Sequence, residues 1–189
     1  QSTMETQNQD HRVCPHTMAC MLDNPFRRLV QSPNRIVGPF IQPGDTAVDL
    51  GCGPGFFTID MARLVGANGR VIAVDLQSQM LAHVRRKALK RNVMDRIELH
   101  QCASGSLELT AEADFILAFY MVHEVPDAAG FFKETRGILK KKGHLLIVEP
   151  RAVVRQTFRH GDGVGAESDV AQLERVPVQC VVQLVRDGH

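Results

Sequence analysis

Short apolar runs alternate with segments of helical period along the chain from about residue 43 onward. Several of the runs are apolar throughout, which is typical of strands covered on both faces of a parallel sheet. The alternation predicts a doubly wound α/β fold, with a mainly parallel sheet and helices on both of its faces. We expect strands at residues 46–50, 70–75, 96–101, 114–120 and 144–149.

Helices are expected between these strands. The first covers residues 55–64 and ends before Gly66, a residue suited to the left-handed conformation that closes many helices. The second starts at Ser78, which is an expected N-cap. One side of this second helix forms an apolar stripe, composed of Leu81, Val84, Ala88 and Leu89.

The other side of the second helix is basic, with Arg85, Arg86, Lys87, Lys90 and Arg91. We interpret this side as a solvated face, favoured by the negative end of the helix dipole, rather than as a nucleic-acid patch. A third helix at residues 127–139 is expected to bury Phe131, Phe132, Ile138 and Leu139. The polar residues 140–143 then predict a turn into the fifth strand.

The two ends of the chain differ from this core. Residues 1–42 predict a flexible leader followed by a helical lid, because Asn24 and Ser32 each precede a proline in the pattern of a helix start. We assign residues 43–150 to the α/β core and residues 151–189 to an atypical extension of the same domain. The extension predicts short helices at 151–158 and 170–176 and a strand at 178–185, and leaves open whether the C-terminal strands complete the sheet.

Composition narrows the class of protein. The length of 189 residues fits one domain, and a net charge of +1 argues against binding to bulk polyanions such as nucleic acid. The 5 cysteines are too few and too odd in number for a disulfide scaffold, so we expect reduced thiols in a cytoplasmic protein. No apolar run reaches the roughly 20 residues that span a bilayer.

The most informative segment is residues 48–56, VDLGCGPGF, where an apolar strand runs into a glycine-rich turn that opens a helix. Such a turn lets a ligand approach the backbone closely at the carboxyl edge of the sheet. Asp75 closes the next strand, where a carboxylate accepts hydrogen bonds from a ribose diol. Asp49 would repel the diphosphate of a dinucleotide but suits an ammonium or sulfonium group, although it also suits a purely structural role in the turn.

With these segments in order, the sequence resembles the class I S-adenosylmethionine-dependent methyltransferases over residues 43–150. The matching segments are residues 48–55, 71–76, 115–126 and 139–149. The resemblance implies a Rossmann-like fold, S-adenosylmethionine as cofactor and S-adenosylhomocysteine as product. It implies these cofactor-binding residues: Asp49, Gly51, Cys52, Gly53, Gly55, Asp75, Leu76, Met80, Ala103, Ser104 and Tyr120.

Two features depart from the family pattern. Residues 102–104, Cys-Ala-Ser, replace the acidic pair that the family commonly places after the third strand to meet the adenine amino group. Ser104 or a backbone carbonyl is left for that contact, and we interpret Cys102 as a small buried hydrophobic residue. Residues 139–143, LKKKG, replace the familiar Leu-Lys-Pro-Gly-Gly turn.

Candidate catalytic residues lie at the carboxyl ends of the fourth and fifth strands. Tyr120, His123 and Glu149 are the candidates, and His123 matches a histidine frequent at this place in the family. A pocket-shaping hydrogen bond is the alternative role for His123, and anchoring a helix is the alternative for Glu149. Methyl transfer from a sulfonium is an in-line displacement, in which positioning supplies much of the catalysis and a general base is optional.

Cys14 and Cys20 have the wrong spacing for a zinc site, so we expect no metal, and a thiol-bound arsenite substrate is an open alternative. The fourth-strand motif of enzymes that methylate nucleic-acid bases is absent from the sequence. We therefore expect a methyltransferase that acts on a small-molecule acceptor, without a membrane or nucleic-acid partner, as a monomer or homodimer. A regulatory subunit that binds the cofactor without turnover is the main alternative, and a nicotinamide-dependent oxidoreductase is disfavoured by Asp49.

Overall fold

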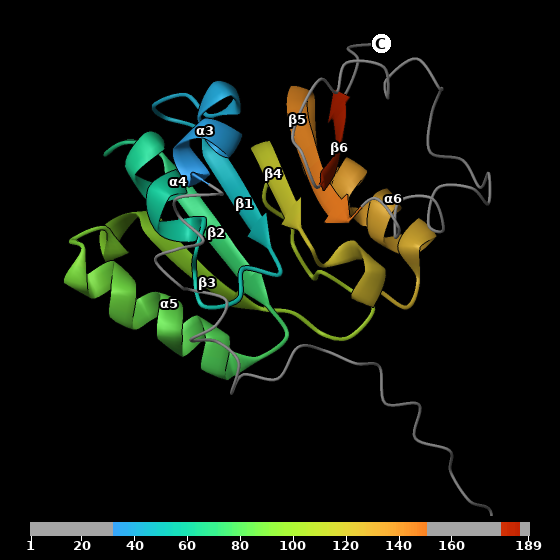
Figure 1. Ribbon diagram of the computed structural model, residues 1–189, viewed down its shortest axis with the longest axis horizontal. Coiled ribbons are helices and arrows are strands. Elements are labelled where there is room, and N and C mark those ends of the chain that lie inside the picture. Colours follow the sequence, from blue (N-terminus) through green and yellow to red (C-terminus); the bar gives the residue numbers. More distant parts are fainter. Residues whose placement is uncertain (1–31, 151–178, 186–189) are drawn as a thin grey trace, which may run out of the picture.

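A computed structural model of the protein describes residues 32–150 and 179–185. One six-stranded sheet has the order β3-β2-β1-β4-β5-β6. The first five strands pair in parallel, and β6 pairs with β5 in the antiparallel direction (Figure 1). The strands are β1 Thr46–Leu50, β2 Arg70–Asp75, β3 Ile97–Gln101, β4 Ala113–Phe119, β5 Leu139–Pro150 and β6 Gln179–Val185.

Helices connect most of the parallel strands. They are α3 Pro33–Val37, α4 Thr58–Leu64, α5 Ser78–Lys90 and α6 Ala128–Ile138, with the 3-10 turns η2 Gly38–Phe40, η3 Met94–Arg96 and η4 Val122–Glu124. The connection from β3 to β4, residues 102–112, contains no helix. The doubly wound, mainly parallel fold predicted from the sequence is confirmed.

The predicted strand positions agree closely with the structure, except at the start of the fifth strand. There β5 begins at Leu139, which pairs with Ala113, and the register then shifts before Phe115 pairs with His144. The predicted turn at 140–143 is thus an irregular segment inside the strand, where Lys142 has a φ of 66°. The polar character of these residues correctly signalled a break in the ladder but not that pairing resumes on both sides of it.

Two hydrophobic clusters cover the two faces of the sheet. One contains side chains of α3, α4 and α5, such as Val37, Met61 and Val84, packed on Phe115. The other contains side chains of α6, such as Phe131, packed on the opposite-facing residues of the same strands. Successive strand residues point to opposite faces, which explains why the strands are apolar throughout.

Two details of α5 differ from the expectation. Gln77 rather than Ser78 is the N-cap residue, and it makes no side-chain capping bond. Leu89 is 57% exposed, whereas Met80 joins Leu81, Val84 and Ala88 on the buried side. The buried stripe therefore begins with Met80, one residue before Leu81. Met80 lies in the first turn of the helix and lines the cavity described below.

The third helix is capped as its sequence suggests. Asp127 is the N-cap of α6, and its Oδ1 accepts a hydrogen bond of 3.0 Å from the Gly130 N–H. Phe131 and Ile138 are buried as predicted, and Phe132 is half-buried. Leu139 is also buried but belongs to β5.

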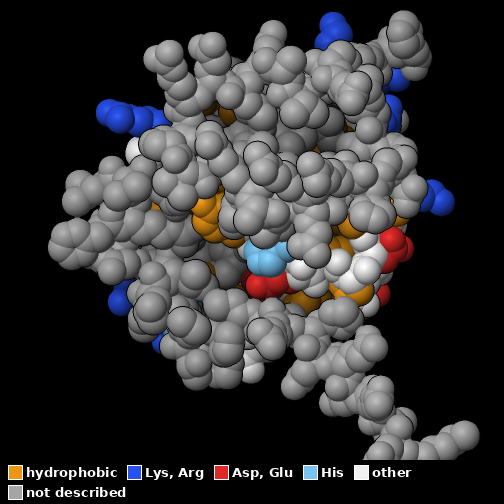
Figure 2. Space-filling view, turned by 45° about the vertical axis from the view of Figure 1, so that its right-hand side comes forward, with side chains coloured by type: hydrophobic (Ala, Val, Ile, Leu, Met, Phe, Trp, Pro, Cys, Tyr) orange, Lys and Arg blue, Asp and Glu red, His pale blue; other side chains and the backbone are white. Residues whose placement is uncertain are grey.

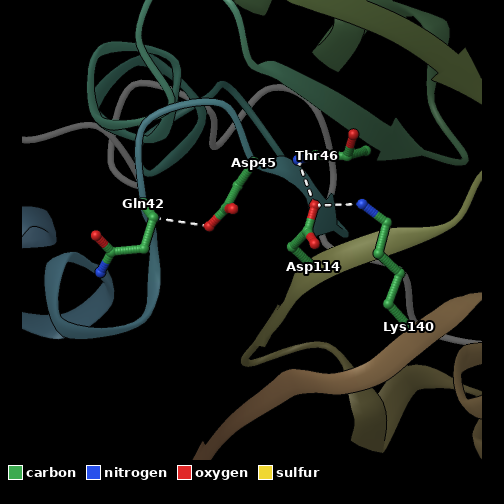
Figure 3. A network of polar contacts seen from close by, with 5 residues as sticks. All are labelled: Gln42, Asp45, Thr46, Asp114 and Lys140. Carbon is green, nitrogen blue, oxygen red and sulfur yellow. Dashed lines mark hydrogen bonds and ion pairs between the residues drawn. The ribbon is translucent and has the colours of Figure 1, made fainter.

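Polar contacts join the strands at the amino edge of the sheet (Figure 3). Asp114 Oδ2 accepts hydrogen bonds from Thr46 N at 2.9 Å and from Lys140 Nζ at 2.7 Å. Asp45 Oδ2 accepts a bond of 2.6 Å from Gln42 N in the preceding turn. These contacts fix the starts of β1, β4 and β5 relative to one another, which sets where their carboxyl ends meet at the other edge.

The predictions for the chain ends are tested only in part. The strand expected at 178–185 is confirmed as β6, which lies beside β5 (Figure 1). A helix starts at Pro33 as expected, although Ser32 makes no capping bond through its side chain. The helix expected after Asn24 and those at 151–158 and 170–176 lie outside the described residues. Across the described ranges no helix is long and apolar enough to cross a membrane.

Candidate active site

The glycine-rich turn after β1 has the backbone conformation that its sequence predicts. Gly51 and Gly53 have φ values of 63° and 51°, in the left-handed region that favours glycine. A Cβ on Gly51 would lie 2.9 Å from Cβ of Met121, so the close approach of that residue also requires glycine. A Cβ on Gly53 would meet no atom within 4 Å. Gly53 therefore leaves open space beside the backbone.

Asp75 ends β2 next to this turn. Its Oδ2 accepts a hydrogen bond of 2.9 Å from Gly53 N, and its Oδ1 accepts one of 2.9 Å from Gln77 N. Burial raises the pKa of this carboxyl group, and the backbone hydrogen bonds partly offset that effect. A carboxylate has about four acceptor positions, so Asp75 can accept a further hydrogen bond beside those from its backbone donors.

Asp49 lies near the end of β1 and is only 2% exposed. Its Oδ2 accepts a hydrogen bond of 2.5 Å from Thr58 Oγ1, at the start of α4. The pKa of Asp49 is raised from 3.8 to about 7, mainly because the carboxyl group is buried; hydrogen bonds from Thr58 oppose this rise, and the negative charge of Asp75 adds to it. A cation placed beside Asp49 would favour its charged form.

Asp49, Gly53 and Asp75 line one cavity at the carboxyl edge of the sheet. The cavity also contains most of the other predicted cofactor residues, namely Gly51, Cys52, Leu76, Met80, Ala103, Ser104 and Tyr120. Gly55, His123 and Glu149 are not among its lining residues. The structure thus brings together the residues expected to bind the cofactor, apart from Gly55, but only Tyr120 of the three catalytic candidates.

Tyr120 enters the cavity from the end of β4 with an unusual backbone. Its φ is 54°, a conformation that is uncommon for a residue with a large side chain. Its N–H donates a hydrogen bond of 2.8 Å to Val148 O, which extends the pairing of β4 with β5 by one residue. The left-handed residue redirects the chain here, and Met121, Glu124, Val125 and Pro126 after it line the cavity.

Glu149 and His123 form a pair that contacts the segment after Tyr120. Glu149 is 1% exposed; its Oε1 accepts a hydrogen bond of 2.7 Å from Val122 N, and its Oε2 lies 2.8 Å from His123 Nδ1. Both carboxylate oxygens thus hold the 3-10 turn η4. This geometry corresponds to the alternative roles considered for both residues, anchoring for Glu149 and pocket shaping for His123.

The sequence alone did not identify several side chains that line the cavity. They are mostly apolar and include Phe56, Phe57, Met121, Val125, Pro126 and Phe131, with Glu124 and Glu134 among the charged residues. Glu134 of α6 accepts a hydrogen bond of 2.7 Å from Leu107 N and so supports the loop that follows β3. Phe56 and Phe57 directly follow the glycine-rich turn, and this position is the signal by which the sequence could have indicated them.

Two cysteine side chains at the site do not ionise readily. Cys52 and Cys102 both line the cavity, and neither forms a disulfide. Burial raises the pKa of both thiols above the ordinary value, so they are neutral at physiological pH. No group of three or more potential metal ligands occurs in the parts of the chain that the structure describes. Cys14 and Cys20 lie outside those parts.

Charged side chains are distributed unevenly over the surface. Figure 2 shows a face on which a histidine and acidic side chains lie next to hydrophobic ones, whereas the visible Lys and Arg side chains lie around the outline. The cavity is lined by the buried carboxylates of Asp49 and Asp75, by Glu124 and Glu134, and by mainly apolar side chains, and no Lys or Arg is among the described residues that line it. Such a site suits a ligand that carries positive charge better than a polyphosphate.

Comparison with known proteins tests the resemblance seen in the sequence. A family described as a methyltransferase domain matches residues 41–180, which is most of the chain. The chain belongs to this methyltransferase family. Membership confirms the expected class of enzyme and S-adenosylmethionine as its cofactor. The residues of the cavity can then be compared with the chemical groups of that cofactor.

The matches to individual relatives cover only part of each relative's length. A demethylmenaquinone methyltransferase of Lactobacillus johnsonii is 34% identical over 58% of this chain and 45% of its own. An arsenite methyltransferase of Halobacterium salinarum is 30% identical over 67% of this chain and 32% of its own. The crystal structure of a SAM-dependent methyltransferase from Aquifex aeolicus is 25% identical, with a TM-score of 0.68, and covers 73% of this chain and 74% of its own. The chain thus spans about half or less of the curated relatives named here.

The residues of this methyltransferase fit its cofactor. S-adenosylmethionine carries an ammonium group, a sulfonium centre and a ribose diol, all of which favour carboxylate neighbours. Asp49 and Asp75 provide two carboxylates within one cavity, and Gly53 leaves room beside the backbone. No phosphate-binding feature is needed, since the ligand has no phosphate.

Proposed function

We propose that this chain transfers a methyl group from S-adenosylmethionine to a small-molecule acceptor by in-line displacement. The observation that carries the proposal is the joint placement of Asp49, Asp75 and Gly53 on one cavity whose remaining walls are mainly apolar. The carboxylates bind a cationic nucleoside ligand, and the apolar walls contact a compact acceptor beside it.

The cofactor end of the cavity follows from the hydrogen-bonding capacity of the two carboxylates. Asp75 binds the ribose hydroxyls with the lone pairs that Gly53 and Gln77 leave available. Asp49 binds the ammonium group in its charged form, and Thr58 keeps its carboxylate oriented. When bound, S-adenosylmethionine supplies an electrophilic methyl group on a sulfonium centre.

The acceptor end lies where β4 ends, next to Tyr120 and Met121. Phe57 and Phe119 pack there with ring centroids 4.5 Å apart, and Phe119 and Tyr120 with centroids 4.6 Å apart. These rings exclude water and hold an acceptor in place, and alignment of the reacting atoms is the main catalytic contribution expected for this reaction. The acceptors in the names of two curated relatives, demethylmenaquinone and arsenite, are small molecules rather than macromolecules, which supports an acceptor of that class.

His123 and Glu149 act as positioning residues in this proposal. Glu149 fixes η4 through Val122 N and His123 Nδ1, and η4 carries Glu124, which lines the cavity. Their contribution is the shape of the acceptor end rather than direct proton transfer. A general base is then needed only for acceptors that are not already nucleophilic at neutral pH.

A turnover assay tests the proposal. Purified protein is incubated with S-adenosylmethionine labelled in its methyl group and with separate thiol, quinol, amine and arsenite acceptors, and formation of S-adenosylhomocysteine is measured. Label transfer to one acceptor class, lost in Asp75→Ala, is the expected result. Tight cofactor binding without transfer to any acceptor would favour the alternative of a binding subunit.

A further inference from the structure

Helix α5 packs against the end of the glycine-rich turn, at Pro54 and Gly55. A Cβ on Gly55 would lie 3.1 Å from Val84 Cγ2, and Gly55 has a φ of 79°, so this glycine permits close packing of the turn on the helix. One turn further along α5, Lys87 Nζ donates a hydrogen bond of 2.5 Å to Pro54 O. These contacts also explain why Gly55 does not line the cavity.

Pro54 is therefore contacted from two sides. It lines the cavity, and its carbonyl oxygen accepts the bond from Lys87. Met80, on the same side of α5, lines the cavity as well, so Met80, Val84 and Lys87 form a row at spacings of four and three residues. Through this row the glycine-rich turn packs against a single helix, α5.

Lys87 differs in this respect from the other basic residues of α5. Arg85, Arg86 and Lys90 are exposed, as expected for a solvated face, whereas Lys87 is half-buried. The sequence interpretation of the whole group as solvated is wrong for Lys87. Extending a lysine side chain into a fixed geometry costs side-chain entropy, which a charge-assisted hydrogen bond offsets.

The turn needs external support because of its composition. Gly51, Gly53 and Gly55 all adopt left-handed conformations, and glycines have the greatest backbone freedom when they are not held. A bond to the carbonyl between two of them removes part of that freedom before a ligand arrives. Preorganisation of this kind raises affinity without any direct contact with the ligand.

We propose that Lys87 is a positioning residue for the amino-acid end of the cofactor, acting through the carbonyl group of Pro54. The inference rests on the proposed function, because it assumes that S-adenosylmethionine occupies the cavity with its amino-acid end at the glycine turn. It adds to that function a residue on the outer side of the turn, beyond contact with the ligand.

Isothermal titration with two ligands tests this role. S-adenosylhomocysteine has the amino-acid end, and methylthioadenosine has the adenosine and the sulfur but lacks that end. In Lys87→Met we expect affinity for S-adenosylhomocysteine to fall by about tenfold, the size of effect of a lost hydrogen bond to a charged group. Affinity for methylthioadenosine should change by less than about twofold. Lys87→Arg should restore most of the loss, and Lys90→Met is the matched control that should bind both ligands like the wild type.

Three results would overturn the inference. Unchanged affinity of Lys87→Met for S-adenosylhomocysteine would show that the bond does not support binding. An equal loss for both ligands, accompanied by a lower urea midpoint, would assign Lys87 to general stability of the fold. Failure of the wild type to bind either ligand would overturn the proposed function itself, and this result is distinct from the other two because it appears without any substitution.

Discussion

The hydroxyl group of Thr58 donates a hydrogen bond of 2.5 Å to the carboxyl group of Asp49, nine residues earlier in the chain. The bond joins the end of β1 to the start of α4 across the glycine turn. It also keeps one carboxylate oxygen oriented in a site where burial raises the pKa of Asp49 to about 7. The protonation state of Asp49 therefore changes near physiological pH, which has consequences for both binding and stability.

Cofactor affinity should depend on pH through Asp49. The charged carboxylate attracts the ammonium group of S-adenosylhomocysteine, and below a pH of about 7 the unliganded protein holds a neutral carboxyl group instead. The dissociation constant should therefore rise as pH falls from about 7.5 to about 5.5, by at most about tenfold per pH unit. Titration calorimetry across this range measures the effect. Asp49→Asn should bind weakly at every pH, and an equally steep profile in that variant would assign the dependence to another group.

Asp49→Asn should also stabilise the protein without ligand at neutral pH. Between pH 3.8 and about 7 the folded state keeps the Asp49 proton that the unfolded state loses, so stability falls as pH rises through this window. Each unit of pKa difference corresponds to about 1.4 kcal/mol, so removing the ionisable group should gain on the order of 2 kcal/mol or more at pH 8. Urea unfolding at about pH 4 and about pH 8 tests this. An equal effect of the substitution at both values would contradict the raised pKa.

How much of this site the sequence predicted depends on the kind of residue. The glycine turn, Asp49 and Asp75 were predicted to lie together because they end two adjacent strands, and the structure places them on one cavity. Glu149 and His123 were correctly placed at the carboxyl edge, yet their side chains contact each other and do not line the cavity; the strand register and the turn after β4 determine that direction. Phe131 and Glu134 reach the cavity from α6, which packs on the opposite face of the sheet, and no local pattern predicts such a contact.

The same distinction applies to the fold. The apolar runs and turn residues predicted the order and approximate bounds of the five parallel strands, because local patterning and sheet burial agree there. They did not predict that pairing of β5 starts at Leu139, since the lysines that follow read as a solvent-exposed turn. Tertiary pairing with Ala113 at the edge of β4 decides that boundary.

Gly51→Ala should impair both folding and binding. A Cβ at this position meets Met121 at 2.9 Å, and the φ of 63° adds the cost of a left-handed alanine, about 1–2 kcal/mol. Gly44→Ala is the matched control, since Gly44 has a φ of 96° but no atom within 4 Å of its Cβ position. Urea unfolding and S-adenosylhomocysteine titration should show a larger stability loss for Gly51→Ala and a loss of affinity only in that variant. Equal behaviour of the two variants would show that contact with Met121 is unimportant.

Glu149→Ala should destabilise the protein more than His123→Ala. It removes the acceptor for the buried Val122 N–H as well as the partner of His123, and an unsatisfied buried donor costs about 1–3 kcal/mol. His123→Ala removes one half-exposed contact and should cost less than about 1 kcal/mol. Neither residue lines the cavity, so affinity for S-adenosylhomocysteine should stay within about twofold of wild type in both variants. A selective loss of affinity in His123→Ala, with stability intact, would instead place His123 in contact with the ligand.

The central claim is that the cavity formed by Asp49, Gly53 and Asp75 binds S-adenosylmethionine. Its most direct test is isothermal titration of the purified chain, in parallel, with S-adenosylmethionine, S-adenosylhomocysteine and NAD. We expect binding of the first two ligands in the micromolar range, no binding of NAD, and a loss of about 1–3 kcal/mol in binding free energy for Asp75→Ala. Binding of NAD, absence of binding by all three ligands, or unchanged affinity in both Asp75→Ala and Asp49→Ala would contradict the claim.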